Sequence, residues 1–308
     1  RRMQGKVGII GMGWVGSSIA ISTLHAGAAR ELLLNDIRKE VAEGDAMDLA
    51  HGAMFYPSAV VRTAEIEEMI DCDVVVITAG RGGKPEESRL ELLRENALLV
   101  AEIGRKLSAC RGTLIVVTNP VDVLTRVVAR ASGLPPSRVI GTGTMLDTAR
   151  LRQVLGEQLN INPRSIHAQV LGEHGDSEVV LWSSASVGGT PLREWPDWKP
   201  EFEPEIAEKV RRAAYEIIRR KGATNHAIGL VTAALVSGIL RDNRRVLTVS
   251  RVQEGILGIG DVALSLPAIV GGSGAAEVIE PRMDEHERSA LLKSIEILRS
   301  AGASIETT

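Results

Sequence analysis

The sequence predicts an α/β fold in which a doubly wound parallel sheet is followed by a mixed α+β domain. In the first half, short apolar runs rich in β-branched residues alternate with longer amphipathic stretches, as strands alternate with helices. After about residue 143 this alternation stops, and helices and strands follow one another irregularly. A chain of 308 residues is long enough for two domains, each with its own core. We therefore expect one domain at residues 1–143 and a second at residues 144–308.

Five strands are expected in the first half, at residues 7–10, 32–35, 74–78, 114–118 and 139–140. They are apolar almost throughout, which is typical of strands in a parallel sheet covered on both faces. Helices are expected between them, at residues 15–26, 39–51, 90–109 and 121–131. Parallel neighbours need crossover connections, which are nearly always right-handed, so the alternation predicts βαβ units. Periodicity alone is also compatible with another α/β fold.

The second half begins with an expected helix at residues 146–159, which ends before an Asn-Pro pair. Further along the chain, strands are expected at 168–171, 178–182, 246–252 and 263–269, and a loop rich in Pro and Trp at 191–204. A long helix is expected from residue 205 to 241, with a break near Gly222. The last helix is expected at residues 285–301, and Asp284 and Glu287 at its start match a capping box.

The composition argues against several classes of protein. Lys and Arg number 36 against 39 Asp and Glu, a net charge of −3, so no basic excess favours nucleic acid. The longest uncharged stretches, residues 227–240 and 262–276, are shorter than a membrane span, and we expect no membrane association. Cys72 and Cys110 form neither a disulfide framework nor a metal-binding motif. We expect a cytoplasmic chain without a signal peptide and without a bound metal.

A glycine-rich turn follows the first expected strand and opens the first helix. Residues 11–16 read Gly-Met-Gly-Trp-Val-Gly, a G-x-G-x-x-G pattern. In a Rossmann-type sheet, Gly11 permits the tight turn, Gly13 lets the backbone approach a pyrophosphate, and Gly16 lets the helix pack on the strand. Asp36 ends the second strand, twenty residues after Gly16, where a carboxylate accepts hydrogen bonds from ribose hydroxyls. The pattern predicts a dinucleotide site.

The carboxylate of Asp36 also indicates which dinucleotide binds, because it would repel a 2′-phosphate and so favours NAD over NADP. Arg38 and Lys39 follow directly and weaken that discrimination. A solvated Asp36 after a glycine turn is the alternative interpretation. The further residues assigned to the cofactor are Val15, Gly80, Arg81 and Asn119.

Three patterns carry the candidate chemistry outside the glycine turn. His174 lies between glycines in a polar turn; taken alone, catalysis and an ordinary solvated histidine are about equally supported. Asp147 and Arg150 are three residues apart on one helix, and by spacing alone a surface ion pair is the better interpretation. Residues 78–89, rich in glycine and charge, are typical of a mobile lid or of an ordinary loop.

Together these motifs resemble the L-lactate/malate dehydrogenase family, and within it the bacterial L-lactate dehydrogenases. The matching segments are Gly-Glu-His-Gly-Asp at 172–176, Leu-Asp-Thr-Ala-Arg at 146–150, Thr-Asn-Pro-Val-Asp at 118–122 and Ser-Arg-Leu at 88–90. They occur in the family's order and at suitable spacing over essentially the whole chain, which is more specific than any single motif. The resemblance implies NAD-dependent interconversion of a 2-oxo acid and an L-2-hydroxy acid in glycolysis, by a homotetramer.

By this resemblance His174 donates the proton to the substrate and takes it back. Asp147 binds the far ring nitrogen of His174 and raises its pKa, while Arg150 holds the substrate carboxylate with two parallel hydrogen bonds. Asp147 and Arg150 then have different partners. Arg89 moves in with the lid and polarises the carbonyl. Asn119 and Thr224 line the substrate pocket.

The resemblance implies pyruvate and L-lactate as the substrates, with one departure. Lactate enzymes of the family generally carry Gln, and malate enzymes Arg, at the position of Gly83. Glycine offers neither an amide nor a cation and leaves space, so malate or a broad range of L-2-hydroxy acids remains an alternative. Glu87 and Thr224 favour a monocarboxylate, whereas Arg81 and Lys84 flank the gap.

Arg152 and His167 match positions at which bacterial lactate dehydrogenases bind fructose bisphosphate across a subunit interface. Two cationic groups facing their symmetry mates form a phosphate site on a two-fold axis, which implies allosteric control. Two unconnected surface residues are the alternative.

Two other functions were weighed against a hydroxy acid dehydrogenase. A dinucleotide-binding protein without turnover needs only the glycine turn and Asp36, and has no use for an acid–base set. An NAD-dependent glycosidase needs a metal-binding Cys and His, and neither Cys72 nor Cys110 lies in a suitable motif.

Overall fold

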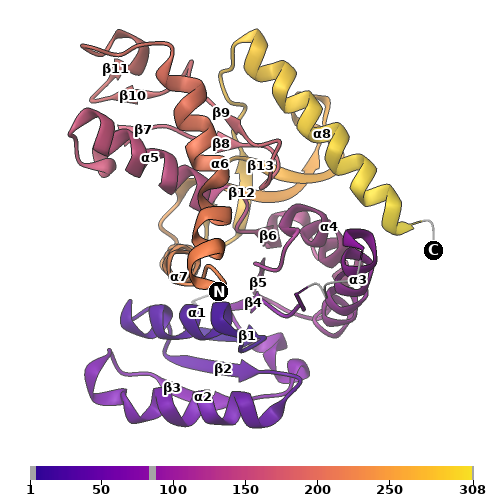
Figure 1. Cartoon of the computed structure of the whole chain (residues 1–308). Coiled ribbons are helices and arrows are strands. Elements are labelled where there is room, and N and C mark those ends of the chain that lie inside the picture. The colour runs from indigo at the N-terminus through magenta and orange to yellow at the C-terminus, as the bar shows by residue number, and fades with distance from the viewer. Residues whose placement is uncertain (1–4, 83–87, 307–308) are drawn as a thin grey trace.

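The central feature of the fold is a nine-stranded sheet with the order β14-β13-β12-β6-β5-β4-β1-β2-β3 (Figure 1). The computed structural model describes residues 5–82 and 88–306. The six strands of the first half pair in parallel and are β1 (Lys6–Ile10), β2 (Glu31–Asn35), β3 (Val60–Thr63), β4 (Val74–Ile77), β5 (Thr113–Val116) and β6 (Val139–Gly141). They alternate with α1 (Trp14–His25), α2 (Lys39–His51), α3 (Arg89–Lys106) and α4 (Val121–Ser132). The predicted doubly wound α/β fold is confirmed.

The sheet continues into the second half of the chain. The antiparallel strands β12 (Arg245–Glu254), β13 (Gly260–Gly271) and β14 (Gly274–Val278) extend it. They join the parallel part where Ser250 of β12 pairs with Gly141 of β6. One sheet therefore runs through both halves of the chain, and the region around β6 is supported by strands from both halves.

The rest of the second half consists of helices around two small sheets. The helices are α5 (Met145–Leu159), α6 (Phe202–Lys221), α7 (His226–Leu240) and α8 (Glu285–Glu306). The small sheets contain β7 (Ile166–His167), β8 (Val170–Leu171), β9 (Val179–Val180), β10 (Ser186–Val187) and β11 (Thr190–Pro191). In Figure 1 these elements lie above β1, β2 and β3, with α8 along one side. The predicted break is present, because α6 ends at Gly222 with a φ of 87°.

The core lies on both faces of the sheet, as the apolar strands predict. Leu32 and Leu34 of β2 pack in one buried cluster with side chains of α1, α2 and α7. Leu33, which points the other way, packs in a second cluster with side chains of α3 and α4. A third cluster joins α5, α6 and the small strands, and a fourth joins α8 to β13. The carboxyl ends of the parallel strands are thereby fixed where the site lies.

The structure differs from the predicted elements mainly in short or edge strands. β3, β14 and three of the two-residue strands were not predicted, because they have too few residues or too mixed a pattern to show a period of two. The capping box at α8 is confirmed, since Asp284 and Glu287 each accept the backbone N–H of the other. Over residues 5–82 and 88–306, no helix is both long enough and apolar enough to span a bilayer.

Candidate active site

A cleft of about 920 Å³ lies at the carboxyl ends of the first parallel strands. Its walls include Gly11, Gly13, Val15, Gly16, Asp36, Gly80 and Arg81, as the sequence predicts for a dinucleotide site. A Cβ on Gly16 would lie 1.9 Å from the Gly11 oxygen, so the third glycine is required for close packing. A Cβ on Gly13 would meet nothing within 4 Å, which leaves space open at the N-terminus of α1. The turn therefore fits a pyrophosphate.

Asp36 joins the end of β2 to the glycine turn. Its Oδ2 accepts the Met12 N–H at 2.7 Å, and its Oδ1 accepts the Arg38 N–H at 2.9 Å. A carboxylate has further lone pairs, so these bonds aim it at the cleft without using up its capacity for ribose hydroxyls. Lys39 forms an ion pair with Glu65. That pairing reduces the pull of Lys39 on a 2′-phosphate, so the residues present fit NAD.

The facing wall of the cleft is formed by the loop after β4 and by α3. The Arg81 N–H donates to Asn96 Oδ1 at 3.0 Å, and Arg81 Nε donates to Glu95 Oε2 at 2.6 Å. Thr224, which is predicted to contact the substrate, lies in the wall of this cleft. The reason is that the segment between α6 and α7 lies against α1, where Asn225 donates to Ser18 Oγ at 2.8 Å.

A second cavity of about 490 Å³ brings together five of the predicted site residues. They come from two helices and two loops, and are Arg89, Asn119, Asp147, Arg150 and His174. Arg89 is the first residue of α3, which starts at a capping box of Ser88 and Glu91. Because α3 contributes to the walls of both the cleft and this cavity, a cofactor and a small acid can meet beside it.

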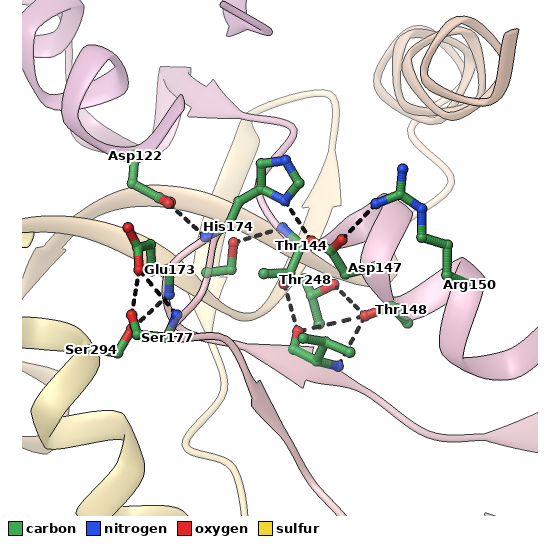
Figure 2. Close-up of polar contacts among 12 residues, drawn as sticks. Asp122, Thr144, Asp147, Thr148, Arg150, Glu173, His174, Ser177, Thr248 and Ser294 are labelled. Carbon is green, nitrogen blue, oxygen red and sulfur yellow. Dashed lines mark hydrogen bonds and ion pairs between the residues drawn. The ribbon is translucent and has the colours of Figure 1, made fainter. Parts of the chain in front are cut away.

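Three side chains form the polar centre of this cavity (Figure 2). His174 Nδ1 lies 2.5 Å from Asp147 Oδ2, and Arg150 Nη1 donates to Asp147 Oδ1 at 3.0 Å. The Asp147 side chain is 3% exposed and that of Arg150 is 13% exposed. Asp147 has His174 as its expected partner and also binds Arg150 through its other oxygen, while the expected contact of Arg150 with a substrate carboxylate stays a prediction. The pair is also buried, unlike the surface pair that spacing alone favours.

The electrostatics of the cavity favour a charged imidazole. Burial lowers the pKa of His174, but the Asp147 carboxylate and its hydrogen bond outweigh burial and raise that pKa to about 9. The loop of His174 is held on its other side by α8, since the Glu173 N–H donates to Ser294 Oγ at 2.8 Å. The imidazole therefore has a fixed position and carries a proton at neutral pH.

Sequence reasoning missed three residues of this cavity, namely Glu178, Arg211 and Tyr215. Burial and the neighbouring Asp147 charge raise the pKa of Glu178 to about 8. Glu178 could have been predicted as a residue of this cavity only from its position four residues after His174. Arg211 and Tyr215 lie on α6, and nothing in the helix pattern distinguishes them from other polar-face residues. Gly83, Lys84 and Glu87, predicted to influence substrate choice, lie outside the described residues.

The predicted effector residues lie apart from both cavities. Arg152 of α5 donates from Nε to the Ala168 oxygen at 3.0 Å, directly after His167 in the chain. Burial and the nearby Arg245 charge lower the pKa of Arg152. His167 is exposed on β7. Within residues 5–82 and 88–306, no group of three or more His, Cys, Asp or Glu residues is arranged to hold a metal.

A cleft fitted to a dinucleotide, beside a cavity that holds an imidazole and three guanidinium groups, defines a dehydrogenase of small carboxylic acids. Residues 5–141 match the lactate/malate dehydrogenase NAD-binding domain, and residues 144–307 match the α/β C-terminal domain of the same family. The chain belongs to the lactate/malate dehydrogenase family. It is an NAD-dependent 2-hydroxy acid dehydrogenase.

Individual relatives agree with this assignment. The chain is 44% identical to an L-lactate dehydrogenase of Thermus aquaticus, over 97% of this chain and 99% of the relative. It is 43% identical to an L-lactate dehydrogenase of Synechococcus sp. (strain JA-3-3Ab), with the same coverage. The crystal structure of a minor L-lactate dehydrogenase from Enterococcus mundtii, in a ligand-bound form, is 39% identical. It superimposes with a TM-score of 0.95 over 99% of both chains.

Proposed function

We propose that this enzyme interconverts pyruvate and L-lactate with NAD, with His174 and Asp147 as its acid–base pair. The observation that carries the proposal is the 2.5 Å contact between His174 Nδ1 and Asp147 Oδ2, in a cavity that Arg150 and Arg89 also line. The names of the relatives support lactate as the substrate. A binding protein without turnover would gain nothing from burying an ionised acid–base pair.

Arg150 binds the substrate carboxylate in this mechanism. Its guanidinium is held by Asp147 through Nη1, which leaves its other N–H donors free to form two parallel hydrogen bonds to a carboxylate. Lysine cannot reproduce that geometry. Arg150 therefore orients the acid so that its carbonyl faces His174.

His174 supplies the proton. Bound NADH supplies the hydride, which the carbonyl carbon accepts as the carbonyl π electrons move to oxygen. Arg89 stabilises the negative charge that develops on that oxygen, and His174 Nε2 donates a proton to it. Asp147 stabilises the imidazolium before transfer and keeps the Nδ1 proton in place afterwards. Lactate oxidation runs the same steps in reverse, starting from neutral His174.

A monocarboxylic substrate fits this cavity better than a dicarboxylic one. Asp176 lines it together with the cations, and its carboxylate would repel a second substrate carboxylate. Malate, or a broad range of L-2-hydroxy acids, remains the second candidate because Gly83 supplies no specificity contact and the family includes both activities. Thr224 and Asn119 complete the substrate contacts in this proposal.

The wider organisation is also part of the proposal. Residues 1–143 bind the cofactor, and residues 144–308 carry most of the substrate site. Arg152 and His167 bind fructose bisphosphate between subunits of a cytoplasmic homotetramer. The cationic character of Arg152 and Arg245 supports an anion site there.

The test is kcat/KM for pyruvate, oxaloacetate and a branched 2-oxo acid, measured by NADH oxidation with and without fructose bisphosphate. Preference for pyruvate is expected. A strong preference for oxaloacetate would overturn the substrate, and no NADH oxidation with any 2-oxo acid would overturn the catalytic proposal. An unchanged KM and an unchanged oligomeric state on adding the bisphosphate would overturn the effector site.

A further inference from the structure

A second buried carboxylate, that of Asp122, contacts the catalytic histidine loop. Asp122 lies in the first turn of α4 and is 1% exposed. Its Oδ2 accepts the main-chain N–H of His174 at 2.8 Å. Figure 2 shows Asp122 and Asp147 on opposite sides of His174. The histidine is therefore held by its backbone from α4 and by its ring from α5.

Burying a carboxylate to accept a single backbone hydrogen bond carries a large desolvation free energy. Burial raises the pKa of Asp122 to about 6, although the His174 N–H and Ser250 act in the opposite direction. The N-terminal end of α4 offsets only part of such a cost. A neutral amide would accept the same N–H with a smaller desolvation penalty. The charge of Asp122 therefore needs a second role, and the imidazole is the titratable cation beside it.

The charges around His174 come from every element that packs against it. Asp147 and Asp122 favour the imidazolium, and Arg150 opposes it. The other charged groups near the ring or its loop are Glu173, Asp176 and Glu178 on the same segment, Arg211 on α6 and Arg89 on α3. Glu173 is bonded to Ser177, and Glu178 is mostly neutral below pH 8. After Asp147, Asp122 is the carboxylate that most favours the His174 imidazolium.

We propose that Asp122 is a positioning residue for His174, whose carboxylate fixes the backbone of the histidine loop and stabilises the imidazolium from the side opposite Asp147. This inference rests on the proposed role of His174 in proton transfer. Asn119 lies in the loop before α4, and Asp122 follows three residues later in the first turn of that helix. Asp122 therefore also connects the segment of Asn119 to the loop of His174.

Asp122→Asn separates the two roles, because the amide oxygen still accepts the His174 N–H but carries no charge. The His174 ring pKa is measured by NMR titration of the protein without cofactor, with its signal assigned by loss in His174→Asn. We expect that pKa to fall by about half a unit or more. The pKa that describes the loss of kcat/KM for pyruvate reduction at high pH should fall by the same amount. Turnover at pH 6 should stay within about threefold, since His174 is protonated there in both proteins.

Two further variants complete the experiment. Asp122→Leu removes the acceptor as well and should lower turnover at every pH, whereas Asp122→Ser is a second neutral acceptor if the asparagine variant is unstable. The matched control is Asp261→Asn, because Asp261 lines a surface cavity together with Asp122 but is exposed and paired with Arg126. It should leave the His174 pKa unchanged.

An unchanged His174 pKa in folded Asp122→Asn, or an equal shift in Asp261→Asn, would overturn the inference. So would a turnover loss in Asp122→Asn that is the same at all pH values, since that is the effect of a purely structural role. If the unmodified enzyme oxidises no NADH with 2-oxo acids, the proposed function fails instead. The NMR titration then still tests whether Asp122 acts on His174.

Discussion

Replacing Asp147 by Asn is the sharpest test of the proton-transfer site. The change keeps the size of the side chain and removes the charge that lies 2.5 Å from His174 Nδ1. Burial lowers the His174 pKa, but Asp147, with a smaller contribution from Asp122, raises it from 6.5 to about 9. A shift of that size corresponds to about 3 kcal/mol of preference for the imidazolium. Without the carboxylate, burial remains, and we expect the pKa to fall to 6.5 or below.

The expected loss of activity depends on pH in a defined direction. In the proposed mechanism, reduction of a 2-oxo acid requires protonated His174, so the rate should fall as pH rises through the His174 pKa. At pH 8 the protonated fraction would drop from about 0.9 to about 0.03, roughly a 30-fold loss. At pH 6 both forms are largely protonated, so any loss there measures misorientation of the ring instead. Lactate oxidation, which needs neutral His174, should gain at pH 7 relative to reduction.

The assay is kcat/KM for pyruvate reduction between pH 5.5 and 9.5 by NADH absorbance. Asp261→Asn, a surface Asp-to-Asn change, is the control for the loss of one negative charge. If kcat/KM of Asp147→Asn still falls with a pKa near 9, Asp147 does not set the protonation of the group that donates the proton. The assignment of the acid–base pair would then be wrong.

Three further changes test the other groups of the cavity. Arg89→Gln should lower kcat about 100-fold or more, which is the usual effect of removing a donor to a developing oxyanion. The affinity for NADH should stay nearly unchanged. Equal losses in kcat and in NADH affinity would contradict the proposed role of Arg89. Arg150→Lys should raise the pyruvate KM about 10- to 100-fold, because lysine cannot form the two parallel hydrogen bonds to the substrate carboxylate. A near-normal KM would show that the substrate carboxylate binds elsewhere. Glu178→Gln should raise Tm, and the gain should grow between pH 5 and 8 and then level off. Folded Glu178 keeps its proton up to about pH 8, whereas the unfolded chain releases it near pH 4.5, so the native protein loses stability with rising pH in that interval. A gain that does not depend on pH would contradict this.

Much of the fold could be predicted because its signals are local. The apolar runs of β1, β2, β4 and β5 and the helices between them follow from periods of two and 3.6 residues within a single element. The glycine turn is equally local, since the close approach of Gly16 to Gly11 spans five residues. Asp36 was predictable because it ends the strand next to that turn.

The edge of the sheet and the arrangement of the site required the tertiary structure. Nothing in β12 indicates that it pairs with β6, and the single pairing of Ser250 with Gly141 joins residues more than a hundred apart. Thr224 lies in the wall of the cofactor cleft because the α6–α7 segment packs on α1, and its contact with the substrate stays a prediction.

The sequence determined which chemical groups this protein has: one glycine turn, an acid at the end of β2, and a histidine, acids and arginines in recognisable motifs. Only the tertiary structure decided their partners. Spacing on α5 suggests that Asp147 and Arg150 form a surface pair, whereas the fold buries them and brings His174, 27 residues away, onto the second oxygen of Asp147. Burial and proximity of charges depend on which elements pack together, and a local pattern carries no information about that packing.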